Sequence, residues 1–386
     1  MRRLLLPIAT ALLAVACNTS DNAGPTPLPA GDLAAGTNWE TMIASAGEGA
    51  MPIRVYQQNV YPGFNIDNLV IGLIQTSGSG NPAYFVDSLA VAMATLDATD
   101  WRERAARMAQ EIEAQNPDVV SLQEMVTIQR QGLQILGLPF ADSRTDFLAI
   151  FTEELAKRGL PYKLVDSLPL TYAPIPISEL FALPLPPGTI FATYYDRDAL
   201  FVRKNVAVAN VVADTFAVGL NEVVYQSRGF IAADLTLRGK TWRYIGTHPE
   251  PSWPAGSNPT QISELLDAAN GTGLPVIIAG DLNLLPTSTW YAQLTGAGFI
   301  DLLQQQYGST AAGYTCCQDD PALRNTSPTL VKRIDYVMAR PAAGYGLGPF
   351  DIEVFGDEPT DRSATGMWPS DHAGLLAKLV LQKLHP

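Results

Sequence analysis

The sequence predicts an α/β (α+β) fold in which two packed, mixed β-sheets are flanked by helices. Two observations support this fold class. Apolar runs typical of strands alternate loosely with segments of helical periodicity, and the runs at 230–237 and 242–247 are separated by a short turn typical of an antiparallel hairpin. A doubly wound parallel sheet would need a helix between consecutive strands throughout, so two sheets with helices outside fit the pattern better.

The composition is that of a large globular domain. The chain has 386 residues, of which 47% are hydrophobic and 16% are charged, and we find no repeat of fixed period. Large two-sheet folds reach this length as one unit, so we expect a single domain over residues 51–383. The formal net charge of −13 and the lack of any basic run argue against a general attraction for nucleic acid, so any groove for a phosphate backbone has to be local.

The first 17 residues have the features of an export signal. Arg2-Arg3 precedes an apolar stretch, Leu4 to Val15, that is too short to span a bilayer. The following Ala-Cys17 ends a segment that resembles the lipobox of bacterial lipoproteins, although Ala14 stands where leucine is usual. We therefore expect lipidation of Cys17, a flexible tether over 18–50, and attachment to the cell membrane or outer membrane with the domain in the periplasm or outside the cell. The alternative is an ordinary secretion signal with an incidental cysteine.

In the first half of the domain, both predicted strands end in a polar side chain, Asn59 in one and Glu124 in the other. The expected elements are a strand over Ile53–Asn59, a long apolar insertion over 64–99, a helix over Trp101–Asn116 with Asp100 as N-cap, a strand over Asp118–Glu124 and a helix over Asp146–Arg158.

The middle of the chain begins with a proline-rich segment. Residues 168–188 contain six prolines among apolar residues, so we expect neither a helix nor a central strand but an excursion on the surface. Strands follow at 200–203 and 206–216, and then comes the hairpin, whose second strand leads into His248. A helix over 260–270 is expected to end at Gly271, a residue suited to the position after a helix.

The central motif of the sequence is Val276-Ile-Ile-Ala-Gly-Asp281-Leu-Asn283. Its apolar run predicts a buried strand, and Asp281 and Asn283 follow where open sheets place ligands. These two residues could simply form a turn. The same pattern recurs after a helix expected over 287–297, in the strand Arg333-Ile-Asp335-Tyr-Val-Met and in Ser370-Asp371-His372 before the last strand, 375–381.

Polar residues thus end many of the apolar strands. They are Asn59, Glu124, His248, Asp281, Asn283, Asp335, Asp371 and His372. Carboxylates and amides dominate this set, and such oxygen donors suit Mg²⁺ or Mn²⁺. His-Glu-x-x-His, Cys₂His₂ and Walker-type spacings are absent from the sequence, which argues against zinc and against a phosphate-binding P-loop. An aspartate beside a histidine, as in Asp371-His372, can orient the imidazole as a general base.

The two cysteines other than Cys17 are adjacent. Cys316 and Cys317 leave three states open, namely a bridge between neighbours, two free thiols, or metal binding. Without a second cysteine pair, they make a poor zinc site.

The motifs resemble those of the endonuclease/exonuclease/phosphatase superfamily, including its deoxyribonuclease-like and sphingomyelinase-like members. The resemblance extends from Ile53 to Leu381, and each short motif gains weight from its order along the chain. The matching motifs are Gln-Asn59-Val, Leu-Gln-Glu124, Thr-His248, Gly-Asp281-Leu-Asn283, Arg-Ile-Asp335-Tyr and Ser-Asp371-His372. The resemblance implies a four-layer sandwich and a Mg²⁺-dependent hydrolase, in which water attacks a phosphate ester, with Mn²⁺ as the other candidate metal.

The resemblance also implies a role for each residue. Glu124 would hold the metal with Asn59 and Asp371, and Asp335 would serve a second metal or the leaving group. Asn59 and Arg228 would bind the substrate phosphate, and His248 and Asn283 would donate to the phosphoryl oxygens. Asp281 would orient the attacking water or the base, and His372 would be the general base held by Asp371.

The substrate is left open by the sequence. Extracellular nucleic acid, a membrane phospholipid such as sphingomyelin, and a small phosphoester all fit an exported phosphodiesterase. The apolar residues of 64–99 and 168–188 would either shelter an acyl chain near the cleft or pack on the core. A non-catalytic binding protein on the same scaffold would have lost residues such as Glu124, Asp281 or His372, and all are present. No obligate protein partner is evident.

Overall fold

The computed structural model describes residues 39, 43, 49–176, 190–217, 227–251, 257–308 and 313–383. The expected signal peptide, and nearly all of the expected tether, lie outside the described residues. Among the helices that are described, none is both long enough and apolar enough to cross a membrane.

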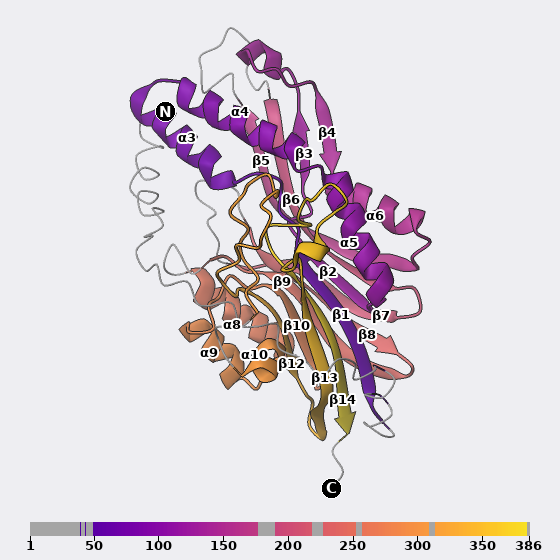
Figure 1. The fold of residues 1–386 in the computed structure, drawn as a ribbon. Coiled ribbons are helices and arrows are strands. Elements are labelled where there is room, and N and C mark those ends of the chain that lie inside the picture. The colour runs from indigo at the N-terminus through magenta and orange to yellow at the C-terminus, as the bar shows by residue number, and fades with distance from the viewer. Residues whose placement is uncertain are drawn as a thin grey trace.

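Two mixed sheets form the centre of the molecule (Figure 1). The eight-stranded sheet has the order β13-β14-β1-β2-β6-β3-β4, with β5 also paired to β6. Its strands are β1 (Met51–Asn59), β2 (Val119–Gln123), β3 (Thr127–Arg130), β4 (Ser143–Asp146), β5 (Tyr162–Pro176), β6 (Ile190–Arg203), β13 (Tyr345–Phe355) and β14 (Gly374–Lys383).

The second sheet has six strands in the order β11-β12-β10-β9-β8-β7. They are β7 (Ala207–Thr215), β8 (Gly229–Leu237), β9 (Lys240–His248), β10 (Val276–Asp281), β11 (Ile300–Asp301) and β12 (Asp335–Arg340). Strand β10 is parallel to β9 and antiparallel to β12, and β1 is parallel to β2 and antiparallel to β14. Both sheets are therefore mixed, which confirms the predicted fold class.

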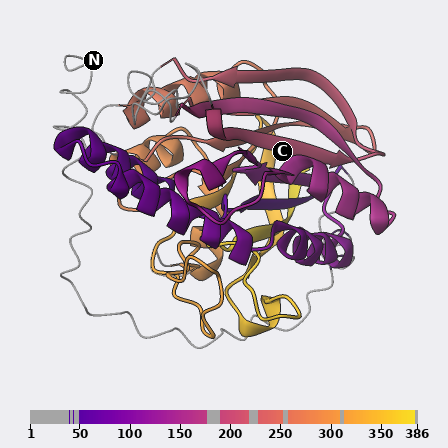
Figure 2. The same ribbon diagram turned by 90° about the horizontal axis from the view of Figure 1, so that it is seen from above.

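Helices cover the outer faces of both sheets, as the view from above shows (Figure 2). They are α3 (Ile66–Ser79), α4 (Ala83–Ala98), α5 (Trp101–Gln115), α6 (Phe147–Lys157), α8 (Ser257–Asn270), α9 (Thr289–Gly296) and α10 (Leu302–Tyr307), with short 3₁₀ turns at Leu133–Leu136 and Pro359–Asp361. Asp100 caps α5, as predicted, because its carboxylate accepts from the backbone N–H groups of Arg102 and Glu103.

Alternation along the strands divides the core into three layers. In β1, Tyr56 points to the cluster beneath α3 to α6, whereas Ile53 and Val55 point to the cluster between the sheets. In β10, Ile277 and Ala279 belong to that same central cluster, and Val276 and Ile278 pack beneath α8 and α9. The four layers are therefore helices, sheet, sheet and helices.

Two segments differ from the prediction. The insertion over 64–99 is the helical pair α3 and α4, and its apolar residues Phe64, Leu69 and Phe85 are buried in the core beneath these helices. The first part of the proline-rich segment is not a surface excursion but strand β5, which pairs only with β6 among the described strands. Proline is tolerated there because a strand at the edge of a sheet leaves one side of its backbone unpaired. Residues 177–189 lie outside the described part.

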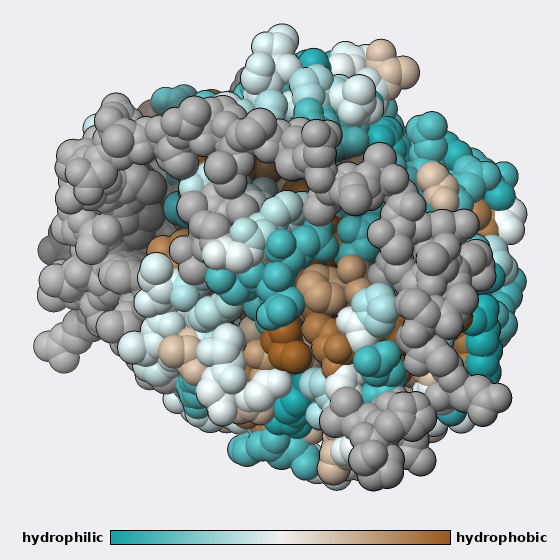
Figure 3. All heavy atoms as spheres, turned by 60° about the horizontal axis from the view of Figure 1, so that its bottom comes forward, coloured by the Kyte–Doolittle hydropathy of each residue, from teal (hydrophilic) through white to brown (hydrophobic). Residues whose placement is uncertain are grey.

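The end of the sandwich at which β14 ends comes forward in Figure 3. Among the coloured residues of this face, polar ones surround a small apolar area near its middle. The polar residues at strand ends, such as Asn59, His248 and Asp281, lie on the opposite side of the sandwich. There β1, β9 and β10 end and β14 begins.

Candidate active site

Strand register brings the marked residues together from both sheets. In β10 and β12, Asp281 is the antiparallel partner of Asp335, and in β1 and β2, Asn59 is the parallel partner of Gln123. His248 ends β9, the parallel neighbour of β10. The strands of the two packed sheets thus deliver their polar ends to one place, which the sequence pattern predicted.

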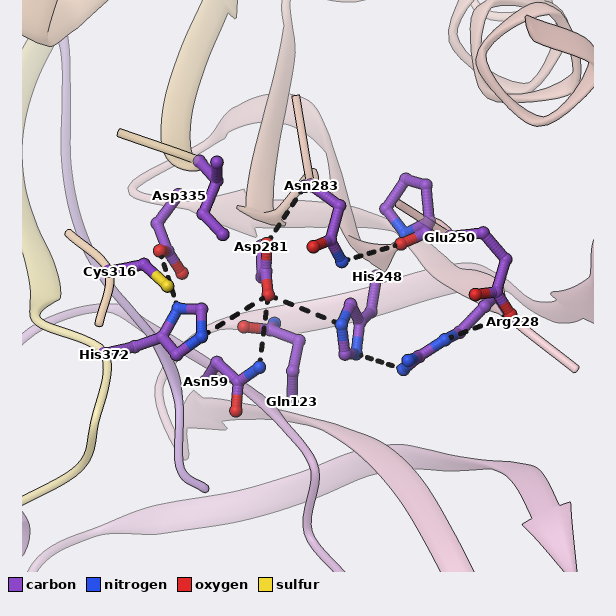
Figure 4. Close-up of polar contacts among 12 residues, drawn as sticks. Asn59, Gln123, Arg228, His248, Glu250, Asp281, Asn283, Cys316, Asp335 and His372 are labelled. Carbon is purple, nitrogen blue, oxygen red and sulfur yellow. Dashed lines mark hydrogen bonds and ion pairs between the residues drawn. The ribbon is translucent and has the colours of Figure 1, made fainter. Parts of the chain in front are cut away.

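Asp281 lies at the centre of this site (Figure 4). Its Oδ2 atom is 3.2 Å from Asn59 Nδ2, 3.4 Å from His248 Nε2 and 3.9 Å from His372 Nε2. Its Oδ1 atom accepts from the backbone N–H of Asn283 at 2.9 Å. Burial alone would raise the pKa of Asp281, but the two imidazoles and these donors hold it well below its usual range. Asp281 is therefore a carboxylate at neutral pH.

His372 is oriented by Asp335. The Nδ1 atom of His372 is 2.9 Å from Asp335 Oδ2, while its Nε2 atom faces Asp281. Asp335 is itself held by Gln57, whose Nε2 donates to Asp335 Oδ1 at 3.2 Å. This carboxylate places the proton of neutral His372 on Nδ1 and leaves the lone pair of Nε2 in the site. Burial would lower the pKa of His372, but Asp335, Asp281 and Asp371 raise it well above its usual value.

The pairing corrects one prediction. The sequence analysis assigned the role of holding His372 to Asp371, its neighbour in the chain, and assigned Asp335 to a metal or leaving group. Adjacent residues at the start of a strand point to opposite sides, so the aspartate that meets the ring comes from β12 of the other sheet.

His248 is backed by Arg228. Arg228 NH1 lies 2.7 Å from His248 Nδ1 and donates to it, which places the proton of the ring on Nε2, on the side of Asp281. Arg228 is buried, with Asp196 at 3.8 Å and Glu250 at 3.4 Å from its guanidinium nitrogens. The sequence analysis expected Arg228 on the substrate phosphate, but the structure places it behind His248 (Figure 4).

A group of buried carboxylates on this side was missed by the sequence analysis. Asp196 and Asp198 lie two residues apart in β6, so they share a face, and Asp198 Oδ1 is 3.9 Å from His248 Nδ1. Burial, and to a smaller degree Asp196, raises the pKa of Asp198 to about 8. The spacing in Tyr-Tyr-Asp196-Arg-Asp198 could have indicated two aspartates on one face of a strand. They were missed because the predicted strand began only at Leu200.

Glu124 and Asp371 are two half-buried carboxylates of the site. Burial raises the pKa of Glu124 to about 7, and the charges of Asp196 and Asp371 add to the effect. Asp281, Asp335 and His372 offer one ligand atom each within 4.8 Å of one another. A dense group of buried carboxylates is costly unless a cation neutralises it, so the donor set fits a divalent metal.

The two amides of the site are anchored to the backbone. Asn59 Oδ1 accepts from the N–H of Tyr61 at 3.1 Å, and Asn283 Nδ2 donates to the carbonyl of Pro249 at 3.0 Å. Each side chain therefore has a fixed direction, and the second N–H of each amide is left for a substrate oxygen.

Gly280 is required by the close approach of β9. A methyl group on Gly280 would overlap the carbonyl oxygen and carbon of Thr247, which precedes His248. We expect Gly280→Ala to lower the free energy of unfolding by about 3 kcal/mol, since backbone in a packed sheet has to move. Chemical denaturation measures this, and Gly271→Ala is the matched control, because space is open there. Equal stability of both variants would contradict the packing described.

The raised pKa values predict how stability depends on pH without metal. Folded Glu124 and Asp198 keep protons up to about pH 7 and 8, respectively, while the unfolded chain loses them near pH 4. The folded state therefore binds more protons in this range, and stability must fall as pH rises. The raised pKa of His372 acts in the same direction, since an imidazolium favoured by folding is lost at high pH.

We expect the Tm of the protein in EDTA to fall by about 5 °C between pH 5.5 and pH 9. Mg²⁺ should raise Tm more at pH 9 than at pH 5.5, because the carboxylates are then charged and bind it. Thermal unfolding followed by circular dichroism tests this. A Tm in EDTA that rises with pH would show that the carboxylates are not destabilising when ionised.

Solved structures with this fold are similar to the chain over most of its length. An endonuclease/exonuclease/phosphatase family protein from Leptotrichia buccalis has a TM-score of 0.52 at 15% identity, covering 85% of this chain and 99% of that one. A family protein from Bacteroides thetaiotaomicron has a TM-score of 0.51 at 13% identity, covering 87% and 99%. TDP2 from D. rerio, complexed with single strand DNA product, has a TM-score of 0.50 at 18% identity, covering 85% and 98%.

The sequence comparisons agree with this fold. No curated protein matches the chain. The model of the Endonuclease/Exonuclease/phosphatase family matches residues 64–372, which include all of the site except Asn59 and Gln57. The chain belongs to the endonuclease/exonuclease/phosphatase family, and it is an enzyme of that family's metal-dependent phosphoesterase class.

Proposed function

We propose that the protein is an exported, Mg²⁺-dependent phosphodiesterase in which His372 activates the attacking water. The observation that carries this proposal is the arrangement around Asp281, which has an imidazole on each side. His372, held by Asp335, is built as a base, and His248, backed by Arg228, is built as a donor. Hydrolysis of a phosphate ester needs both, a base for the water and donors for the charge that develops on phosphorus.

Glu124, Asp371 and Asp281 are the residues that we assign to Mg²⁺, with Mn²⁺ as a substitute. Bound Mg²⁺ would neutralise the phosphate oxygens and stabilise the charge of the transition state. Oxygen ligands are what these ions require, and a strongly perturbed pKa such as that of Glu124 is common at functional sites.

The roles of the remaining residues follow from their directions. His372 accepts a proton from water at Nε2, and Asp335 stabilises the resulting imidazolium through Nδ1–H. The second amide N–H groups of Asn59 and Asn283 donate to phosphoryl oxygens, and the N–H of His248 at Nε2 donates to Asp281. Asp281 keeps Asn59 and His248 turned into the site and orients the water that His372 deprotonates.

The substrate class is a phosphodiester. Deoxyribonuclease-like and sphingomyelinase- or phospholipase C-like activities are the two candidates. Some of the apolar side chains of α3, α4 and β5 that had favoured a lipid are buried in the core, whereas Ile71, Val91 and Tyr172 are exposed, so the lipid candidate keeps only part of that argument. The TDP2 structure with single strand DNA product makes single-stranded DNA a substrate to test, while the net charge of −13 weighs against long nucleic acids.

We also propose that Cys17 is lipidated and that residues 18–50 tether the enzyme to a membrane. The support is the sequence alone, in which a basic pair, a short apolar stretch and small residues precede Cys17. Cys17→Ser should release the enzyme from the membrane fraction of a bacterial host and abolish its labelling by a radioactive fatty acid. Membrane association that the Cys17→Ser variant keeps unchanged would contradict an anchor at Cys17.

The substrate class is tested with four substrates in parallel, each with Mg²⁺ and with EDTA. These are single-stranded DNA, plasmid DNA, sphingomyelin vesicles and bis(4-nitrophenyl) phosphate, with 4-nitrophenyl phosphate as the monoester control. We expect hydrolysis of diesters in Mg²⁺ only, and none by His372→Ala. Turnover of the monoester alone would contradict the diester assignment, and activity that His372→Ala retains would contradict the assigned base.

A further inference from the structure

The adjacent cysteines lie inside the site, beside the proposed base. Cys316 and Cys317 are joined by a disulfide, and Cys317 Sγ is 4.0 Å from His372 Nε2. This is the same nitrogen that faces Asp281 and that takes the proton from water. Cys316 is buried and its sulfur is visible beside Asp335 and His372 in Figure 4.

Backbone hydrogen bonds hold the cysteines between the segment that leads to Asp335 and the segment that carries His372. The N–H of Cys316 donates to the carbonyl of Lys332 at 2.9 Å, and the N–H of Ala373 donates to the carbonyl of Thr315 at 2.7 Å. The N–H of Gln318 donates to the carbonyl of Asp371 at 2.8 Å. These hydrogen bonds therefore hold the backbone of the two cysteines beside His372 without involving the sulfurs.

The three side chains form a donor set that differs from the carboxylate site. One sulfur each from Cys316 and Cys317 and one nitrogen of His372 all lie within 4.8 Å of one another. Zinc bonds of about 2.0 Å to nitrogen and 2.3 Å to sulfur place tetrahedral ligands roughly 3.5–3.8 Å apart. The gap of 4.0 Å between Cys317 Sγ and His372 Nε2 is already close to that separation.

We propose that Cys316, Cys317 and His372 form a soft-metal site that exists only when the disulfide is reduced, and that Zn²⁺ bound there blocks the base. As a disulfide, the sulfurs are uncharged and leave His372 Nε2 free. As thiolates, they complete a Cys₂His set with an open fourth position, and soft ligands prefer Zn²⁺ over Mg²⁺. In the sequence, the lack of a second cysteine pair made these cysteines a poor zinc site. The fold supplies a third ligand instead, because it brings His372, 55 residues further on, to Cys317.

Both chemical steps balance. A dithiol reductant breaks the S–S bond by exchange, gives two electrons and two protons to the cysteines, and leaves as its own cyclic disulfide. Zinc then displaces the two thiol protons and takes the Nε2 lone pair of His372. Inhibition rests on the proposed function, because it requires His372 to be the base, but metal binding does not.

Binding is tested with Co²⁺ as a spectroscopic probe on the full chain carrying Cys17→Ser, in which the only thiols are Cys316 and Cys317. We expect no free thiol before reduction with dithiothreitol and two afterwards. After the reductant is removed under argon, the reduced protein should take up one Co²⁺ with sulfur-to-metal charge-transfer absorption, and Zn²⁺ should displace it. The oxidised protein should show no such band.

Variants assign the ligands. Cys317→Ser should remove most of the band, and His372→Ala should weaken Co²⁺ binding by about 10-fold or more. Asp371→Asn is the matched control, because it changes the oxygen site without touching a soft ligand, and its band should persist. A reduced parent without the band, or a band of equal strength in Cys317→Ser, would overturn the site; the parent comparison holds even if a variant misfolds.

Inhibition is measured separately, in saturating Mg²⁺. We expect the reduced enzyme to be inhibited near one equivalent of Zn²⁺, and the oxidised enzyme to need about 100-fold more. If the reduced protein shows charge-transfer absorption but Zn²⁺ does not inhibit it, the metal site is present and the proposal that bound Zn²⁺ blocks His372 is wrong. If no diester is turned over at all, the proposed function fails, while the Co²⁺ spectra still decide the metal site.

Discussion

Replacing Asp335 by asparagine should lower kcat by about 10³–10⁴-fold, because the substitution puts the proton of His372 on the wrong nitrogen. Gln57 Nε2 donates to Asp335 Oδ1, so the amide oxygen of the asparagine stays on the Gln57 side. Its NH₂ group then faces His372 Nδ1 and donates to it. Nε2 carries the proton as a result and cannot accept one from water.

The control is a double-variant cycle that measures kcat in saturating Mg²⁺. His372→Ala should cost about as much as Asp335→Asn, and the double variant no more than either, since both act through one nitrogen. Asp371→Asn, in contrast, should add its own loss to that of Asp335→Asn because it acts at the metal. Independent, multiplying losses for Asp335 and His372 would mean that they do not form one unit.

Replacing Asp281 by asparagine lowers kcat by at least about 10³-fold, and this is the second large effect that we expect. Oδ1 accepts from the N–H of Asn283, so the oxygen of the new amide keeps that bond. The NH₂ group then takes the place of Oδ2, where the donors Asn59 Nδ2 and His248 Nε2 point. Donors would face donors, and both side chains would turn away from the substrate.

Kinetics and thermal unfolding together separate this effect from a loss of structure. Asp234→Asn is a matched control. Asp234 is also a buried carboxylate of the second sheet, and it pairs with Arg243 at 2.8 Å. It lies in β8, five residues from Gly229, the residue that pairs with His248. It should lower Tm with little change in kcat. An Asp281→Asn variant with kcat within 10-fold of the parent would remove Asp281 from the centre of the site.

The sequence predicted the fold class and most of the site because both depend on local patterns. A buried strand such as the one that begins at Val276 is visible as an apolar run, and the polar residue that ends it, Asp281, follows the run after one glycine. Asn59, His248, Asp281 and His372 do converge, since strand ends on one side of packed sheets must meet.

Contacts that depend on register between strands could not be predicted. The partner of His372 is Asp335 rather than its neighbour Asp371 because β12 and β14 belong to different sheets. The positions of Gln57 and of Cys317 beside the dyad have the same origin. Strand β5 was missed for a different reason. Its prolines lack the N–H that a central strand needs, so the sequence did not indicate a strand, although an edge strand tolerates them.

The most direct test of the proposed enzyme is the initial rate of bis(4-nitrophenyl) phosphate hydrolysis as Mg²⁺ is titrated into the EDTA-treated protein. We expect no turnover without metal and a rate that saturates with Mg²⁺. In Glu124→Gln, the midpoint should move to about 10–100-fold higher Mg²⁺. Turnover that is equal in EDTA and in Mg²⁺, or an unmoved midpoint in Glu124→Gln, would contradict a metal-dependent phosphodiesterase built on Glu124 and Asp281.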